Sequence, residues 1–145
     1  SLVLLTLLGC TSKPVIKVQA QGALDKHSAE AVSGTVPVAI TNTSPREIEL
    51  LEYHYTVAVD GGQVWSGRHA GELVLSPGLD RHASLPVVLK GTWPKHEPVR
   101  CRVHGSLVFI GNGVFDETLV ELGYRPSASF EGAVELVPAQ SAQAN

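Results

Sequence analysis

The stretch of sequence that decides the fold is Leu51-Glu52-Tyr53-His54-Tyr55-Thr56-Val57-Ala58-Val59-Asp60-Gly61-Gly62. Leucine, tyrosine and valine side chains occupy every second position, and polar or small residues lie between them. This period of two is typical of a β-strand with one buried face and one wet face. The Asp-Gly-Gly ending predicts a hairpin turn into a second strand at residues 63–67. The stretch therefore predicts an antiparallel hairpin.

The same alternation recurs along the chain, at residues 36–40, 85–89, 101–109 and 128–136. Turn-forming residues separate these segments, as in Ser76-Pro77-Gly78 and Gly111-Asn112-Gly113. A sustained 3.6-residue period is missing, and residues 24–32 are a weak candidate for a helical turn. The adjacent Asp116 and Glu117 are interpreted as part of a solvated strand. The pattern predicts an all-β protein, an immunoglobulin/fibronectin-III-like antiparallel β-sandwich of about seven strands.

Composition sets the size and narrows the class of function. The chain has 145 residues, of which 43% are hydrophobic, enough for one domain with one core. The net charge of −3 argues against a nucleic-acid partner, which would need a basic surface. The expected organisation is a signal-peptide remnant at 1–9, a tether at 10–14, the domain at 15–137 and a flexible tail at 138–145.

The N-terminus is an apolar run that ends at Cys10. As a helix, such a run would span only about 12 Å, against about 30 Å of hydrocarbon, so it is too short to cross a bilayer. Leu7-Leu8-Gly9-Cys10 resembles the bacterial lipobox. That resemblance implies a signal peptide that is cleaved before Cys10, and a diacylglyceryl group on the Cys10 thiol. Thr11 follows in place of Asp, which favours the outer membrane, so we expect a lipid-anchored envelope protein on the periplasmic face.

Lipidation of Cys10 would leave Cys101 as a single thiol, without an intramolecular disulfide. Cys101 shares its strand face with apolar residues, so we expect it to be a small buried hydrophobic residue instead of a reactive thiol.

Residues 33–137 resemble a late embryogenesis abundant (LEA) type 2 domain, also called the water stress and hypersensitive response (WHy) domain. The similarity rests on an apolar strand that ends in Asn42, on the Tyr53–Val57 pattern, and on Gly61, Gly67 and Gly105. The family's proline directly after the asparagine is displaced here to Pro45. The resemblance implies a fibronectin-III-like sandwich, no known active site, and roles in desiccation or other stress. Asn42 and the three glycines are expected to be structural.

The sequence carries no evident catalytic or metal-binding motif. The six histidines are not spaced as metal ligands, and a Gly-x-Ser-x-Gly motif is missing. Cys101 and His104 are three residues apart, which places them on opposite faces of a strand. We therefore expect no catalytic residues, no metal and no cofactor, although a metal site built from distant residues stays open.

One strand face is basic, because Arg100, Arg102 and His104 share it. These residues could form cross-strand pairs with Glu131 and Glu135, or a basic strip against anionic headgroups. Trp93 lies in a loop and is a candidate for an exposed contact, with partial burial as the alternative.

The expected function is a non-enzymatic protective or interaction module that contacts the membrane, envelope proteins or stress-labile clients. Two alternatives are a periplasmic carrier that holds an apolar ligand and an accessory domain of an envelope assembly. A large pocket inside the sandwich would favour the carrier, whereas a filled core with exposed edges would favour the module.

Overall fold

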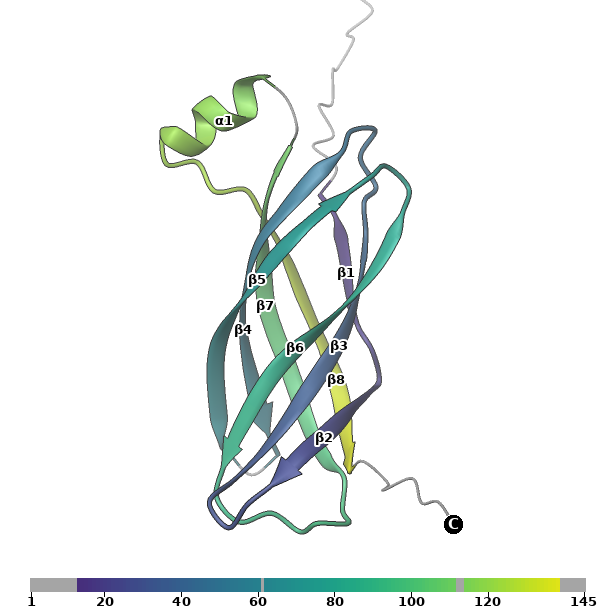
Figure 1. Cartoon of the computed structure of the whole chain (residues 1–145), viewed down its shortest axis with the longest axis vertical. Helices are drawn as coiled ribbons and strands as arrows, with labels where there is room; N and C mark the ends of the chain where they lie inside the picture. Colours follow the sequence, from purple (N-terminus) through teal and green to yellow (C-terminus); the bar gives the residue numbers. More distant parts are fainter. Residues whose placement is uncertain (1–12, 61, 112–113, 139–145) are drawn as a thin grey trace, which may run out of the picture.

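The computed structural model describes residues 13–60, 62–111 and 114–138, which form eight strands and one short helix (Figure 1). The elements are β1 (Val15–Val18), β2 (Gln21–His27), β3 (Ala31–Thr41), β4 (Ile48–Val59), β5 (Val64–Leu75), β6 (Asp80–Lys90), β7 (Val99–Gly111), α1 (Val114–Glu121) and β8 (Ser127–Pro138). The predicted all-β class is confirmed, with one strand more than the predicted seven. Cys10 and the predicted signal remnant lie outside the described residues, and β8 includes Pro138, the first residue of the expected tail.

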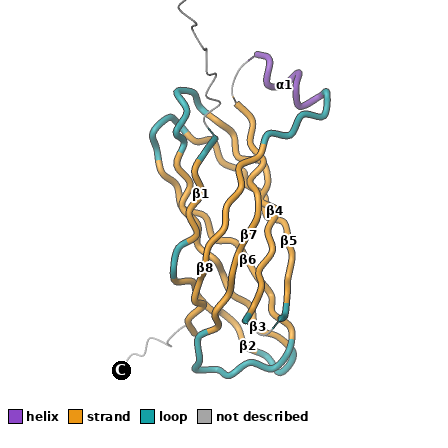
Figure 2. Tube along the Cα trace, turned by 180° about the vertical axis from the view of Figure 1, so that it is seen from behind, coloured by secondary structure: helices purple, strands orange, loops and turns teal. Residues whose placement is uncertain are grey.

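Hydrogen bonds join all eight strands into one mixed sheet, in the order β1-β3-β2-β8-β7-β4-β5, with β6 paired to β3. Every pair is antiparallel except β2 with β8, which run parallel. The sequence predicts a purely antiparallel sandwich, and alternation along single strands carries no information about this parallel pair. In Figures 1 and 2 the sheet curls around a common interior.

A single core fills this interior, because the apolar side of each strand points inward. The predicted rows 36–40, 85–89 and 128–136 all contribute buried side chains. Tyr55 donates a hydrogen bond from its hydroxyl to the carbonyl of Pro86 in β6. The side-chain amide of Gln63 donates to the carbonyl of Lys90, at 2.8 Å. These two bonds link the β4–β5 hairpin to β6, the strand with which it shares no backbone ladder.

A β-bulge changes the predicted alternation at Leu51. The register of β4 slips between Leu50 and Glu52 against both β5 and β7. Leu50 is therefore buried and Leu51 is only half-buried, whereas the pattern predicts Leu51 in the core. The extra residue keeps Leu50 and Tyr53 on the same face of the strand.

Two local predictions are wrong. Residues 24–32, a candidate helical turn, form the end of β2, a turn and the start of β3. Asp116 and Glu117, interpreted as strand residues, lie in the first turn of α1, where acidic side chains favour the helix N-terminus.

The elongated molecule has two different ends. At the helix end, β1 begins opposite Thr41 of β3, Ile48 pairs with Leu75 and Gly111, and α1 follows β7 (Figure 2). At the hairpin end lie the β2–β3 turn, the β4–β5 turn and the β6–β7 loop. The described chain starts at Lys13, at the helix end.

Candidate functional site

The candidate site is the polar sheet face, defined as the outward side chains of β5, β4, β7 and β8. Strand pairing arranges them in cross-strand rows. One row holds Arg68, His54, Ser106 and Ser129, and the next holds Ser66, Thr56, His104 and Glu131. Half of these side chains are short serines or threonines, and the other half are charged or imidazole groups.

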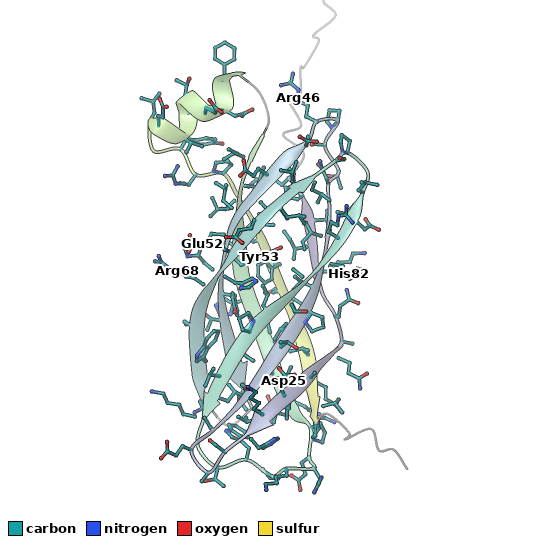
Figure 3. The ribbon with its side chains drawn as sticks, in the orientation of Figure 1. Asp25, Arg46, Glu52, Tyr53, Arg68 and His82 are labelled. Atoms are coloured by element: carbon teal, nitrogen blue, oxygen red, sulfur yellow. The ribbon has the colours of Figure 1, made fainter. Side chains whose placement is uncertain are left out.

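Glu52 is the centre of a small charge cluster on this face. Its Oε1 lies 3.5 Å from His54 Nε2 and 3.8 Å from Arg68 Nε. Figure 3 shows Glu52 and Arg68 beside each other on the outside of the sheet. Because all three side chains are substantially exposed, water screens these pairs and they contribute little to stability. They remain available to outside partners.

Several shallow hollows mark the polar sheet face, and two of them adjoin the charge cluster. One, of about 590 Å³, lies over the middle of β5, β4 and β7, and the other, of about 720 Å³, extends toward α1. Both are lined in part by His54 and Ser106. The first is lined by His54, Tyr55, Thr56, Ser66, Gly67, Arg68, His104, Gly105 and Ser106; the second by Leu51, Glu52, His54, Ser106, Val108, Val120, Arg125 and Ser127. Such open hollows suit reversible contact with polar groups.

The described residues hold no cluster of three or more His, Cys, Asp or Glu side chains that could bind a metal ion. In the same part of the chain, no helix has the length and apolarity needed to cross a membrane.

Of the predicted basic strip, Arg100 and Arg102 lie toward the hairpin end, and His104 lies near the middle of β7. Arg100 pairs in register with Glu135, and its Nε lies 3.9 Å from Glu135 Oε2. Trp93 is half-buried, packs against the core and donates from Nε1 to the carbonyls of Leu89 and Lys90. Partial burial of Trp93 is the alternative that the sequence left open, whereas the side chains of Arg100 and Arg102 are exposed.

Cys101 is buried, as the sequence predicts. Burial raises the pKa of its thiol to about 11, with a further contribution from the negative charge of Asp60. The thiol is therefore protonated at neutral pH and a poor nucleophile.

Asn42 is completely buried after the end of β3. Its Nδ2 donates to the carbonyls of Arg46 and Leu75, at 2.7 and 2.9 Å. Its Oδ1 accepts from the backbone N and the hydroxyl of Ser44, at 3.0 and 2.7 Å. The side chain thereby ties the β3–β4 loop to the end of β5.

Gly67 and Gly105 flank Tyr55 on the two neighbouring strands. A Cβ at Gly67 would lie 2.2 Å from the Trp65 ring, which packs beside Tyr55 with ring centroids 5.5 Å apart. A Cβ at Gly105 would lie 2.3 Å from the carbonyl oxygen of His54. Both glycines therefore permit close packing around Tyr55. Gly61 lies outside the described residues.

The Glu52–His54–Arg68 cluster was missed in the sequence, because its members come from two strands. His54 and Arg68 face each other only through the β4–β5 register. The hairpin turn was the available signal, since counting outward from it pairs Thr56 with Ser66 and His54 with Arg68.

Neither a protein-family model nor a curated protein matches the sequence. Solved structures do share the fold. A structural-genomics target superposes with a TM-score of 0.60 at 12% identity, over 91% of this chain and 92% of its own. A candidate ApaA protein from Bordetella pertussis gives 0.57 at 14% identity, over 88% and 95% of the two chains.

The solution structure of a candidate LEA protein is also similar. Its TM-score is 0.56 at 15% identity, over 92% of this chain and 77% of its own. At such low identity, the likeness establishes a shared fold and nothing beyond it.

Proposed function

We propose that this chain is a non-enzymatic LEA type 2-like β-sandwich protein that protects stress-labile partners and is held at a bacterial envelope membrane by a lipid on Cys10. The observation that carries the protective role is the structural similarity to a candidate LEA protein over 92% of this chain. The lipobox-like Leu7-Leu8-Gly9-Cys10 carries the anchor.

The packing of the interior favours an interaction module over a carrier of apolar ligands. Buried side chains from every strand fill the interior as one cluster. The hollows of about 590 and 720 Å³ open on the outer face, where both polar and apolar side chains line them. A carrier of apolar ligands would need a cavity of several hundred Å³ among the buried apolar side chains of the interior.

The polar sheet face is the surface that we assign to client contact. Its exposed Glu52, His54 and Arg68 offer charges of both signs beside hydroxyl groups such as Thr56 and Ser66, which share a 3.0 Å contact. A surface of this kind replaces hydrogen bonds that a client loses when water is removed.

The test of the protective role is survival of a labile enzyme through drying or freezing. The full chain should preserve more activity than an equal mass of an unrelated β-sandwich protein. The double variant Glu52→Ala, Arg68→Ala should protect less well than its matched control Asp25→Ala, His82→Ala, which removes two exposed side chains from other strands. Equal survival with the chain and with the unrelated protein would refute protection.

The anchor is tested separately by the intact mass of the membrane-extracted protein. A diacylglyceryl group on an N-terminal Cys10 is the expected result, and it should disappear with Cys10→Ser. Protein that keeps an unmodified thiol at position 10 would refute the anchor without affecting the protective role.

A further inference from the structure

The helix end of the molecule exposes most of the large hydrophobic side chains on the surface, beside charged ones such as Arg46 and Glu49. Nine large hydrophobic side chains are exposed in the described residues, and seven of them lie at this end. Val64 and Val88, the other two, lie toward the hairpin end. The seven, which we call the apolar end, are Val15, Val74, Leu79, Phe115, Leu119, Leu122 and Tyr124.

Helix α1 and the turn after it provide the most exposed part of the apolar end. Phe115 and Leu122 are 79% and 78% exposed, and Leu119 is 40% exposed. These three positions follow the i, i+4, i+7 spacing of one helix face. Among residues 115–121 of α1, Asp116 and Val120 are half-buried, and they lie to one side of this stripe. The apolar stripe of α1 is therefore exposed, on a helix that projects beyond the strands in Figure 1.

The chain leaves the described structure at this same end. Lys13 precedes β1, whose first residue, Val15, is paired with Thr41 at the helix end and belongs to the apolar end. Cys10 is three residues before Lys13, so the two are at most about 10 Å apart at ~3.4 Å per residue. A lipid on Cys10 would thus hold the apolar end against the bilayer.

We propose that the apolar end docks on the membrane, with the Phe115–Leu119–Leu122 stripe immersed among the lipid headgroups and upper acyl chains. This inference rests on the proposed anchor, which would supply the proximity. An exposed apolar helix face lying in the interface is a known mode of membrane contact, and Tyr124 has the amphipathic ring that favours this depth. The occupant is a lipid surface.

The charges of α1 indicate that the contact is apolar and not electrostatic. Between Val114 and Glu121 the helix carries three acidic residues and no basic one. Anionic headgroups would not attract such a helix, so zwitterionic lipid should suffice and salt should matter little. The basic Arg100 lies 11 residues from Gly111 along β7, or roughly 36 Å at ~3.3 Å per residue. Docking by the apolar end would leave it far from the bilayer.

Vesicle flotation of the unlipidated full chain, Cys10→Ser, tests this contact apart from the anchor. With phosphatidylcholine vesicles, the chain should float with the lipid equally well at low and high salt. The triple variant Phe115→Ser, Leu119→Ser, Leu122→Ser should bind at least about tenfold more weakly. The matched control Val64→Ser, Val88→Ser removes exposed apolar side chains from the other end and should bind like the parent.

A second measurement places the stripe by depth. Phe115→Trp should be quenched by brominated acyl chains in the vesicles, and Val64→Trp should not, with circular dichroism confirming that every variant is folded.

Three results would overturn the docking proposal: no flotation of the Cys10→Ser chain, equal flotation of the triple variant, or a dimer that the triple variant dissociates. The last would assign the stripe to a second copy of the chain. Absence of lipid on Cys10 would overturn the anchor alone, because the flotation experiment does not use it.

Discussion

Asn42 uses all the hydrogen-bonding positions of its side chain within the protein, two as donor and two as acceptor. Asn42→Ala would leave the carbonyls of Arg46 and Leu75 without these partners. We expect a loss of about 3 kcal/mol in the free energy of unfolding, measured by urea denaturation. Thr43→Ala is the control, since the Thr43 hydroxyl makes one exposed bond, to the Lys13 carbonyl. Similar losses for the two variants would contradict the structural role of Asn42.

Tyr53 and Tyr55 predict a loss of stability in alkali. Burial raises the pKa of each phenol from 10.0 to about 12. Between these values the unfolded chain ionises and the folded chain does not, so the unfolded state binds fewer protons and stability falls as pH rises. Below the unfolded pKa of 10 this contribution is fully present.

Tyr53→Phe isolates the effect, because it keeps the buried ring and removes the ionisable hydroxyl. The drop in unfolding free energy between pH 8 and pH 11 should be about 1 kcal/mol smaller in this variant than in the parent. The same drop in both proteins would show that Tyr53 does not titrate as its burial implies.

At the scale of single elements, the contact between β4 and β7 at Gly105 is the most demanding. A Cβ there would meet the His54 carbonyl oxygen at 2.3 Å and the Tyr55 Cα at 2.8 Å, which are backbone atoms held by the ladder. Gly105→Ala should therefore cost about 2 kcal/mol, read from the denaturation midpoint. Ser106→Ala, the next residue and on the outer face, should change stability by less than about 0.5 kcal/mol. Equal losses of stability in the two variants would mean that β4 and β7 can move apart to accommodate a Cβ at position 105.

Most strands could be predicted from the sequence, because alternation at residues 36–40, 53–59 and 101–107 reflects one buried face. The bulge at Leu51 could not, since it depends on registers with two other strands. Helix α1 could have been found: Phe115, Leu119 and Leu122 carry the helical spacing, and acidic residues occupy its first turn. The helix is only eight residues long, and the surrounding sequence is dominated by a period of two, so its helical spacing is easily overlooked.

β2 was misjudged for a different reason. Residues 21–27 do not alternate between apolar and polar side chains. They form a strand because they pair with β3 on one side and with β8 on the other. Tertiary pairing here overrides weak local preference.

For the whole molecule, composition and turn spacing predicted one β domain, whereas the joining of all strands into one sheet was not predictable from them. The candidate site was predictable only in part. The exposed face of Arg100 and Arg102 follows from alternation, but the Glu52–His54–Arg68 cluster and the apolar end depend on which strands become neighbours.

The parallel pairing of β2 with β8 has a consequence for how the protein comes to be folded. It joins residues 21–24 to residues 135–138, nearly the full length of the described chain. During synthesis the sheet therefore stays incomplete until β8 has emerged from the ribosome, and contacts so distant in sequence form slowly. We expect nascent chains that end before Ser127 to be digested by protease, and chains that extend through Pro138 to become resistant.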